Sequence, residues 1–242
     1  MDPEEDAVSD GHDFQTIYDV LRERISLLDY PPGTLLSENR LAAEFGVSRT
    51  PIRRVLHRLE FDGLVTVTRG IGTIVTPIDM RYLAQVYALR RKLLDLIGEG
   101  SATHVTAADL ALLEDILERA RSLNGRVAPR TLAELYLRFN EGLTRAIGNR
   151  PLREIADRLF HQTSRVWHQL LPELDMGEEA DALADEVSGV LDGLRARDME
   201  NVARVRRHHF EAMLRRMNRH LVGSELETPA AIPEGGESAL SS

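Results

Sequence analysis

The chain has 242 residues, a hydrophobic content of 43% and a formal net charge of −9 at pH 7. This size allows one large domain or two modest ones, with enough apolar side chains for a packed core. The absence of cysteine excludes disulfide bridges, a thiol nucleophile and a cysteine metal site. No apolar run reaches the roughly 20 residues of a membrane-spanning helix, and the acidic N-terminus lacks the pattern of a secretory signal. We therefore expect a cytoplasmic protein with no membrane partner.

The N-terminal segment combines an acidic start with helical periodicity. Residues 1–11 carry five acidic side chains and no basic one, and we expect them to form an acidic flexible tail. Residues 13–29 repeat apolar side chains at helical spacing, which predicts a helix that ends before the turn sequence YPPG. A short second helix is expected in ENRLAAEFG, capped by Ser37 and closed by Gly46.

A third helix and a hairpin complete this part of the chain. The helix follows Ser48, a candidate cap, and stops at Gly63, while Pro51 is tolerated in a first turn whose amides lack helical partners. The segments LVTVT and TIV alternate on either side of RGIG, which is typical of a two-stranded hairpin. The order of helices, turn and hairpin predicts a winged helix-turn-helix domain over residues 12–78.

Beyond residue 78 the periodicity is almost wholly helical. The pattern predicts an antiparallel bundle over residues 79–222, followed by a Gly-, Pro- and Ser-rich disordered tail over residues 223–242. The fold class expected from the whole chain is therefore mainly α, a winged helix-turn-helix followed by an all-helical bundle. About six helices are expected in it, near residues 78–99, 106–124, 129–147, 150–171, 177–197 and 199–220.

The third helix is strongly basic although the chain is acidic. Four arginines lie between Arg49 and Arg58 with no acid among them. Arginines of this kind also occur on ordinary solvated helices, but a recognition helix presents its first residues to bases and phosphates, which suits the guanidinium fork. The turn of the hairpin is where a wing reaches the minor groove. We predict a double-stranded DNA partner, contacted by Ser48, Arg49, Thr50, Pro51, Arg53, Arg54, Arg69 and Gly70.

The stretch LLSENRLAAEFGVSRTPIRRVLHRLEFDGLVTVTRGIGTIV, and its GVSRTP run above all, resembles the DNA-binding domain of the GntR family of bacterial transcription regulators. The resemblance spans residues 13–78 and implies a domain that binds a palindromic operator as a homodimer. Two positions depart from it. The family often has an acid where this chain has Arg54, and an arginine near the position of Asn39, so no operator sequence is implied.

The segments VYALRRKLLDLI, YLRFNEGLTRAIGNRPL and LDGLRARDMENVARVRRHHFEAM resemble the helical effector-binding and dimerisation domain called FCD, of the FadR-like branch. Six helices rather than seven would favour its VanR-like subgroup. Many FCD domains hold a divalent metal through one Asp and three His. The matching positions here are Tyr136, Asn140, Val187 and His209, of which only the last is a usual ligand. We therefore expect no metal cofactor, the family's site having been lost.

Without a metal, an anionic effector needs an organic cation inside the bundle. Arg90, which matches an arginine of the family, is the first candidate and Arg165 the second, because a buried guanidinium can hold a carboxylate bidentately. Tyr136 and Asn140 could line the same cavity, and His209 is open to a core role as well as to a ligand contact.

Together these features favour a ligand-responsive bacterial transcription regulator, a repressor rather than an activator, with a small anionic metabolite bound in its helical domain. The alternative is an effector-less DNA-binding protein whose helical domain only dimerises. An enzyme is disfavoured, because the chain has no cysteine nucleophile, no Glu-x-x-His motif and no nucleophile elbow.

Overall fold

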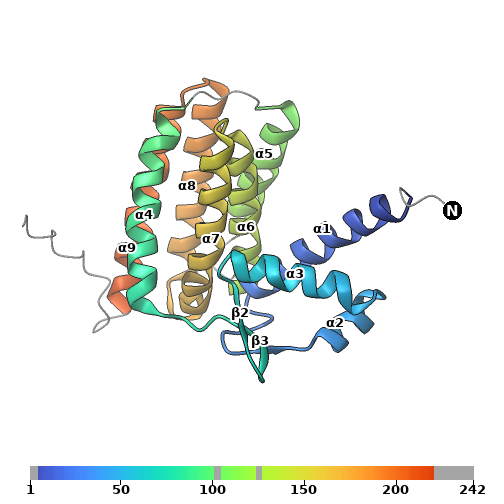
Figure 1. Ribbon diagram of the computed structural model, residues 1–242. Helices are drawn as coiled ribbons and strands as arrows, with labels where there is room; N and C mark the ends of the chain where they lie inside the picture. The colour runs from blue at the N-terminus through green and yellow to red at the C-terminus, as the bar shows by residue number, and fades with distance from the viewer. Residues whose placement is uncertain (1–4, 101–104, 124–126, 221–242) are drawn as a thin grey trace, which may run out of the picture.

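The structure is a computed structural model that describes residues 5–100, 105–123 and 127–220. A small N-terminal lobe, called the head below, lies against one end of a helical bundle (Figure 1). This arrangement confirms the predicted fold class. The head contains α1 (Glu5–Ser26), β1 (Leu35–Leu36), α2 (Glu38–Phe45), α3 (Arg49–Phe61), β2 (Val65–Thr68) and β3 (Gly72–Val75). The bundle contains α4 (Met80–Gly98), α5 (Ala107–Ser122), α6 (Pro129–Ala146), α7 (Arg150–Leu170), α8 (Met176–Arg195) and α9 (Met199–His220), with a 3-10 turn at Leu171–Glu173.

The head is built around the packing of α1 on α3. Its sheet is antiparallel with the strand order β1-β3-β2, and Val65 pairs with Val75 in the predicted hairpin. The third strand, in which Leu35 pairs with Ile74, was not predicted, since two residues are too few to show alternation. The buried side chains of this core are Ile17, Tyr18, Leu21, Ile25, Leu36, Leu41, Ala42, Ile52, Val55, Leu56, Leu59, Leu64, Val65 and Val75.

Helix boundaries in the head differ from the prediction in two places. The helix α1 begins at Glu5, so residues 5–11, expected in a flexible tail, are helical. It ends at Ser26 rather than near residue 29, because Leu28 adopts a left-handed backbone with φ of 64°. The C-terminal tail expected over residues 223–242 lies outside the described residues.

The caps of α2 follow the prediction. The Ser37 side chain accepts a hydrogen bond from the backbone amide of Arg40, and Gly46 takes the left-handed conformation that ends the helix. Ser48 occupies the N-cap position of α3, but its hydroxyl makes no capping bond in the described part of the chain. The cap role proposed for that side chain is therefore not supported.

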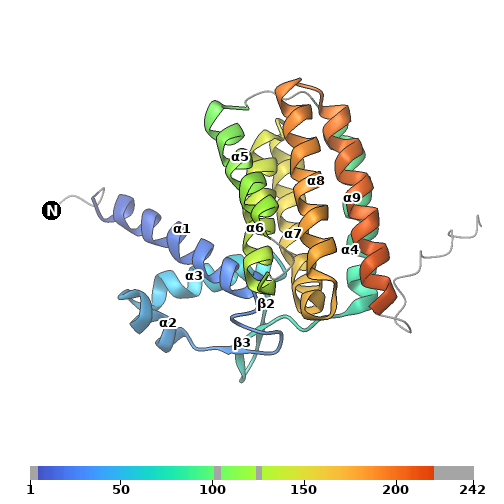
Figure 2. The same cartoon turned by 180° about the vertical axis from the view of Figure 1, so that it is seen from behind.

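In the bundle, α4 packs against α9 and α7, and α5 packs against α6 and α8. The six α-helices of the described bundle match the number predicted. Figure 2 shows α8 and α9 side by side, and a Cβ at Gly193 would lie 2.7 Å from the Val202 side chain, so this close approach requires a glycine. None of the helices in the three described segments is long and apolar enough to cross a bilayer.

Candidate functional site

The start of α3 presents basic side chains to solvent. Its buried face, which includes Ile52 and Val55, faces the head core, while the Arg49 and Arg53 side chains are 60% and 55% exposed. Ser48, Thr50 and Arg54 are exposed as well. Pro51 is buried, so it belongs to the helix start and core rather than to a contact surface. The guanidinium of Arg54 lies over the ring of Phe14 on α1, 5.4 Å from its centroid.

The β2–β3 turn forms a projecting wing, which extends from the head away from the bundle (Figure 1). Arg69 and Gly70 are exposed at its tip, and Ile71 beside them is 60% exposed. Gly70 and Gly72 have φ of 79° and 121°, values that L-residues rarely adopt, so the tip depends on both glycines. The basic start of α3 and the β2–β3 hairpin are thus both exposed on the head.

Inside the bundle, Arg90 of α4 is buried among aromatic rings. Its guanidinium lies over the rings of Phe160 and Phe210 and donates to the Thr163 hydroxyl at 2.5 Å. Among the described residues no carboxylate forms an ion pair with it, and burial lowers its pKa. A buried cation without a counter-ion is costly unless something anionic offsets it, which makes this position a candidate for ligand binding.

A second arginine lies near Arg90. Arg206 of α9 pairs with Glu186 of α8 at 2.5 Å, and both side chains are almost fully buried. Its Nε forms no hydrogen bond in the described structure. Arg90, Arg206 and Asn140 line a cavity of about 30 Å³ whose other walls are mostly apolar. Two guanidinium groups beside an apolar cavity can take a small carboxylate or another compact anion.

The positions that correspond to the family's metal ligands do not fit a metal. Val187 is fully buried and has no donor atom, while the Tyr136 hydroxyl contacts the Met213 sulfur at 4.0 Å. Tyr136 and His209 line a separate cavity of about 20 Å³, and Asn140 faces the other one. Within the described residues no three His, Cys, Asp or Glu side chains are grouped for a metal.

Internal ion pairs occupy this region instead. Arg216 of α9 pairs with Glu179 of α8, and the Trp167 indole donates to the same carboxylate at 3.2 Å. Burial raises the pKa of Glu186, although Arg206 opposes that effect. In this region each carboxylate is therefore paired with an arginine of the same chain. Such ion pairs are unlike the ligands of a zinc or manganese site.

Arg165 lies elsewhere than predicted. It is 2% exposed and donates to the backbone oxygen of Thr76 at 3.0 Å, on the side of α7 that faces the head. Burial lowers its pKa to about 10. The five residues predicted for an effector site are therefore divided among three places. Arg90 and Asn140 line one cavity, Tyr136 and His209 line another, and Arg165 lies at the Thr76 backbone.

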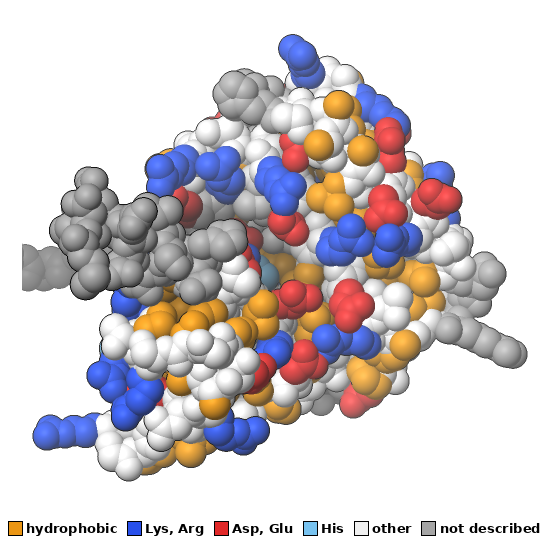
Figure 3. Space-filling model, turned by 90° about the vertical axis from the view of Figure 1, so that its right-hand side faces the viewer, with side chains coloured by type: hydrophobic (Ala, Val, Ile, Leu, Met, Phe, Trp, Pro, Cys, Tyr) orange, Lys and Arg blue, Asp and Glu red, His pale blue; other side chains and the backbone are white. Residues whose placement is uncertain are grey.

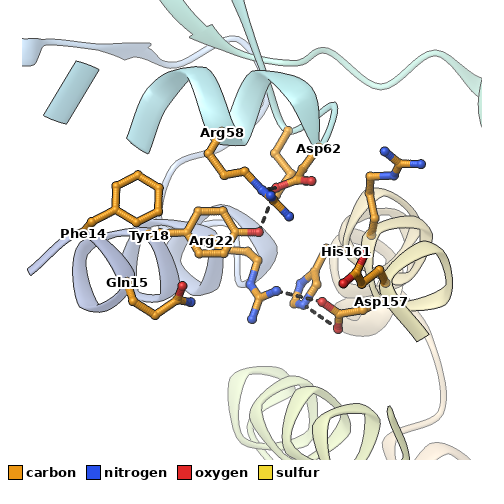
Figure 4. A pocket seen from close by; sticks show the side chains of 11 residues that line it. Phe14, Gln15, Tyr18, Arg22, Arg58, Asp62, Asp157 and His161 are labelled. Atoms are coloured by element: carbon orange, nitrogen blue, oxygen red, sulfur yellow. Dashed lines mark hydrogen bonds and ion pairs between the residues drawn. The ribbon is translucent and has the colours of Figure 1, made fainter. Parts of the chain in front are cut away.

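The head contacts α7 through a polar junction (Figure 4). Arg22 of α1 pairs with Asp157 of α7 at 2.8 Å, and Asn140 of α6 donates to the other oxygen of the same carboxylate at 3.3 Å. The Ser26 hydroxyl lies 2.8 Å from Nδ1 of His161. Burial of Asp157 would raise its pKa, but the hydrogen bond from His161 and the charge of Arg22 outweigh burial and lower it. One carboxylate thus joins the head to the helix that carries Asn140.

Two hollows flank this ion pair. They have volumes of about 280 and about 380 Å³, and both are lined by Arg22, Asp157 and His161. The space-filling view shows acidic and basic side chains gathered around the hollowed surface between head and bundle (Figure 3). Gln162 closes the junction deeper in, donating to the backbone oxygen of Asp62 at 2.7 Å.

Sequence reasoning did not identify Arg206 or the junction. A signal for Arg206 exists, because it interrupts an apolar stripe on α9 formed by Met199, Val202, Ala203, Phe210, Met213 and Met217. The junction left no comparable signal, because only the structure shows that residues 159–168 are all buried although polar side chains lie on every face of this segment.

Residues 14–75 match the family "Bacterial regulatory proteins, gntR family", and residues 85–212 match the "FCD domain". The chain is 25% identical to the HTH-type transcriptional repressor RspR of Escherichia coli (strain K12), over 81% of this chain and 85% of RspR. It is 28% identical to the uncharacterized HTH-type transcriptional regulator YdhC of Bacillus subtilis (strain 168), over 59% of this chain and 64% of YdhC. A regulator in an unstable DNA locus of Streptomyces ambofaciens is 46% identical, over 31% of each chain.

Solved structures show the same architecture. Escherichia coli McbR/YncC has a TM-score of 0.71 at 19% identity, covering 86% of this chain and 98% of that one. A GntR-type regulator of Rhodococcus sp. RHA1 has a TM-score of 0.63 at 17% identity, covering 85% and 97%. The sequence relatives RspR and YdhC are transcription regulators, the class that was predicted for this chain. The two matched domains, which adjoin each other as the head and the bundle, show that the chain belongs to the gntR family of bacterial regulatory proteins and that its bundle is an FCD domain.

Proposed function

We propose that the chain is a ligand-responsive repressor that binds a palindromic operator as a homodimer and releases it when a small anion, such as a carboxylate, binds in the bundle. The observation that carries the proposal is the buried guanidinium of Arg90, which faces a cavity shared with Arg206 and has no carboxylate partner among the described residues. A cation kept in such a place at a cost to stability indicates a binding role.

The volume of this cavity constrains how an effector enters. About 30 Å³ holds one or two water molecules and no metabolite. Binding must therefore separate the helices that carry Arg90, Asn140 and Arg206, namely α4, α6 and α9. A ligand that binds only the opened bundle shifts the protein toward that conformation.

Asn140 and Asp157 are the proposed relay from this cavity to the head. Asn140 lines the cavity and donates to Asp157, and Asp157 pairs with Arg22 of the head. A displacement of α6 would alter the geometry at Asp157 and thereby the packing of α1 against α7. Since each subunit of a dimer contacts one half-site, a change in head orientation alters the half-site spacing and weakens operator binding.

An apolar stripe on α4 supports the dimer. Tyr82, Leu89 and Leu96 recur every seven residues and are 51%, 48% and 48% exposed. Such a stripe suits pairing with the same helix of a second copy in a two-fold contact. Leu89→Glu should shift the protein toward monomers in sedimentation velocity, whereas Arg81→Glu, on an exposed position of the same helix, should leave the dimer intact. A monomeric wild-type protein would refute the dimer.

The DNA interface is tested by selection from a randomised duplex pool. The wild-type protein should enrich one sequence with two-fold symmetry, and the double variant Arg49→Ala and Arg53→Ala should lose its binding while melting at the same temperature. Arg91→Ala, an exposed arginine of α4, is the matched control and should bind normally. Unchanged binding by the double variant would refute the assignment of α3 as the recognition helix.

The effector is tested by a thermal-shift screen of carboxylates, sugar acids and acyl-CoAs. A compound that raises the melting temperature of the wild-type protein should fail to stabilise Arg90→Met and should still stabilise Arg91→Ala. It should also reduce binding to the selected duplex. If no class of compound stabilises the wild-type protein, the alternative of a bundle that only dimerises is favoured instead.

A further inference from the structure

An acidic side chain of the head meets the recognition helix. Glu38, the first residue of α2, accepts hydrogen bonds from Nη2 of Arg49 at 3.1 Å and from Nε and Nη2 of Arg53 at 3.2 and 3.0 Å. The Glu38 side chain is 27% exposed, whereas those of both arginines are more than half exposed. One carboxylate therefore joins the two helices of the helix-turn-helix motif through both predicted DNA-contacting arginines.

The bonding pattern leaves a defined part of each guanidinium available. Arg53 uses its side-on edge, Nε and Nη2, to bind both oxygens of Glu38, and no described residue bonds the Nη1 of its end-on edge. Arg49 bonds Glu38 through Nη2. A guanidinium needs one bidentate edge to bind a carboxylate and another to bind the N7 and O6 atoms of guanine. Both arginines can consequently bind a base without releasing Glu38.

This arrangement also prepares the arginines before DNA arrives. A long side chain that is already ordered loses less rotamer freedom on binding than a free one. The hydrogen bond from Arg53 lowers the pKa of Glu38, burial opposes it, and the hydrogen bond from Arg49 adds to the lowering. The carboxylate therefore keeps its charge, and its hold on both arginines, across the neutral pH range.

We propose that Glu38 is a positioning residue for operator recognition, which holds Arg49 and Arg53 in one geometry and thereby contributes to base discrimination. The proposal rests on the proposed function in one respect, namely that these arginines contact bases. The proposal makes a different prediction from a role in which the Glu38 charge only repels DNA. A negative charge that only repels DNA lowers the affinity for every sequence equally, so its removal would raise all affinities and leave discrimination unchanged.

The experiment compares two duplexes, the sequence that the wild-type protein enriches and a scrambled duplex of equal length and composition. Glu38→Gln removes the charge and one acceptor oxygen at nearly constant size. Glu44→Gln is the control, because it makes the same charge change on the same helix, where Glu44 pairs with Arg24 of α1. We expect Glu38→Gln to lower the ratio of the two affinities about tenfold. Glu38→Gln and Glu44→Gln should bind the scrambled duplex with the same affinity. The salt dependence of binding should be the same for both variants as for the wild-type protein.

A second variant separates charge from geometry. Glu38→Asp keeps the charge but is shorter by one methylene group, so it cannot hold both guanidinium groups, and its ratio should fall as well. A wild-type ratio in Glu38→Asp, or in Glu38→Gln, overturns the positioning role. Loss of melting cooperativity in a variant would mean that Glu38 supports the fold rather than the arginines and would also overturn it. The Arg49→Ala and Arg53→Ala double variant is measured alongside; if it binds the selected duplex normally, the proposed function fails, not the role of Glu38 alone.

Discussion

We expect His168 to make the stability of the protein sensitive to mildly acidic pH. It lies on α7 at the junction, where its Nδ1 donates to the backbone oxygen of Ser26 at 2.5 Å. Its Nε2 has no hydrogen-bond partner in the described structure. Protonation would place an N–H donor and a positive charge in this site. Burial therefore lowers the pKa of His168 to about 4, an effect that the nearby charges of His161 and Arg130 reinforce and the Ser26 oxygen opposes.

The magnitude follows from the two pKa values. The unfolded chain has the ordinary value of 6.5, and the folded value is about 4. Because folding lowers the pKa, the stabilisation is complete above pH 6.5 and is lost as the pH falls from 6.5 toward 4. The full difference corresponds to about 3 kcal/mol, of which about 2 kcal/mol is lost between pH 8 and pH 5. Asp157 contributes little in this window, since its pKa lies below the usual value.

The assay uses the single tryptophan. Trp167 is buried and its ring centroid lies 5.4 Å from that of His168, so its fluorescence reports unfolding of this region in urea. His168→Asn retains a side-chain N–H close to the position of Nδ1 and cannot titrate. The free energy of unfolding of the wild-type protein should fall by about 2 kcal/mol more than that of the variant between pH 8 and pH 5. His57→Asn, at an exposed position, should behave like the wild-type protein. An equal fall in His168→Asn and wild type would refute the reasoning.

Three further predictions concern the junction and the core. In a double-mutant cycle of Arg22→Met and Asp157→Asn, urea unfolding should give a coupling energy of about 1 kcal/mol, because their side chains are 24% and 27% exposed. Gly63→Ala should lower the free energy of unfolding by about 1–3 kcal/mol, since Gly63 has a φ of +75° and a Cβ there would lie 2.6 Å from the Gln162 amide nitrogen. Phe139→Ala, at a fully buried position, should cost about 3–5 kcal/mol in the same assay.

The head was predictable because its boundaries depend on local chemistry. The helix α2 lies between Ser37 and Gly46, a polar cap and a left-handed glycine, as its sequence indicated. The strand β1 was not predictable, because its two residues owe their conformation to pairing with β3 rather than to any pattern of their own. The end of α1 likewise depends on the left-handed Leu28, which no local rule would assign to a leucine.

The bundle interior was predictable only in part. Arg90 and Asn140 were named from the resemblance to the FCD domain, not from periodicity. Periodicity places a residue on a helix and estimates which face is buried. It does not give the rotation of one helix relative to the next. Arg165 therefore was assigned to the effector cavity but faces the Thr76 backbone instead. Arg206, which lines the cavity, was overlooked because a buried arginine in an apolar stripe needs a partner such as Glu186 that only the packing reveals.

The position of α7 offers a route for the proposed coupling between two domains with separate cores. Residues 159–168 of this helix are buried on every face, so the same segment of the helix contacts the bundle and the head. Thr163 accepts from Arg90 on the bundle side, while His161 bonds Ser26 on the head side. Because interiors are closely packed, a small rotation of α7 that changes its contacts with the bundle must also change its contacts with the head. A single helix with two occupied faces would therefore act in parallel with the proposed relay through Asn140 and Asp157.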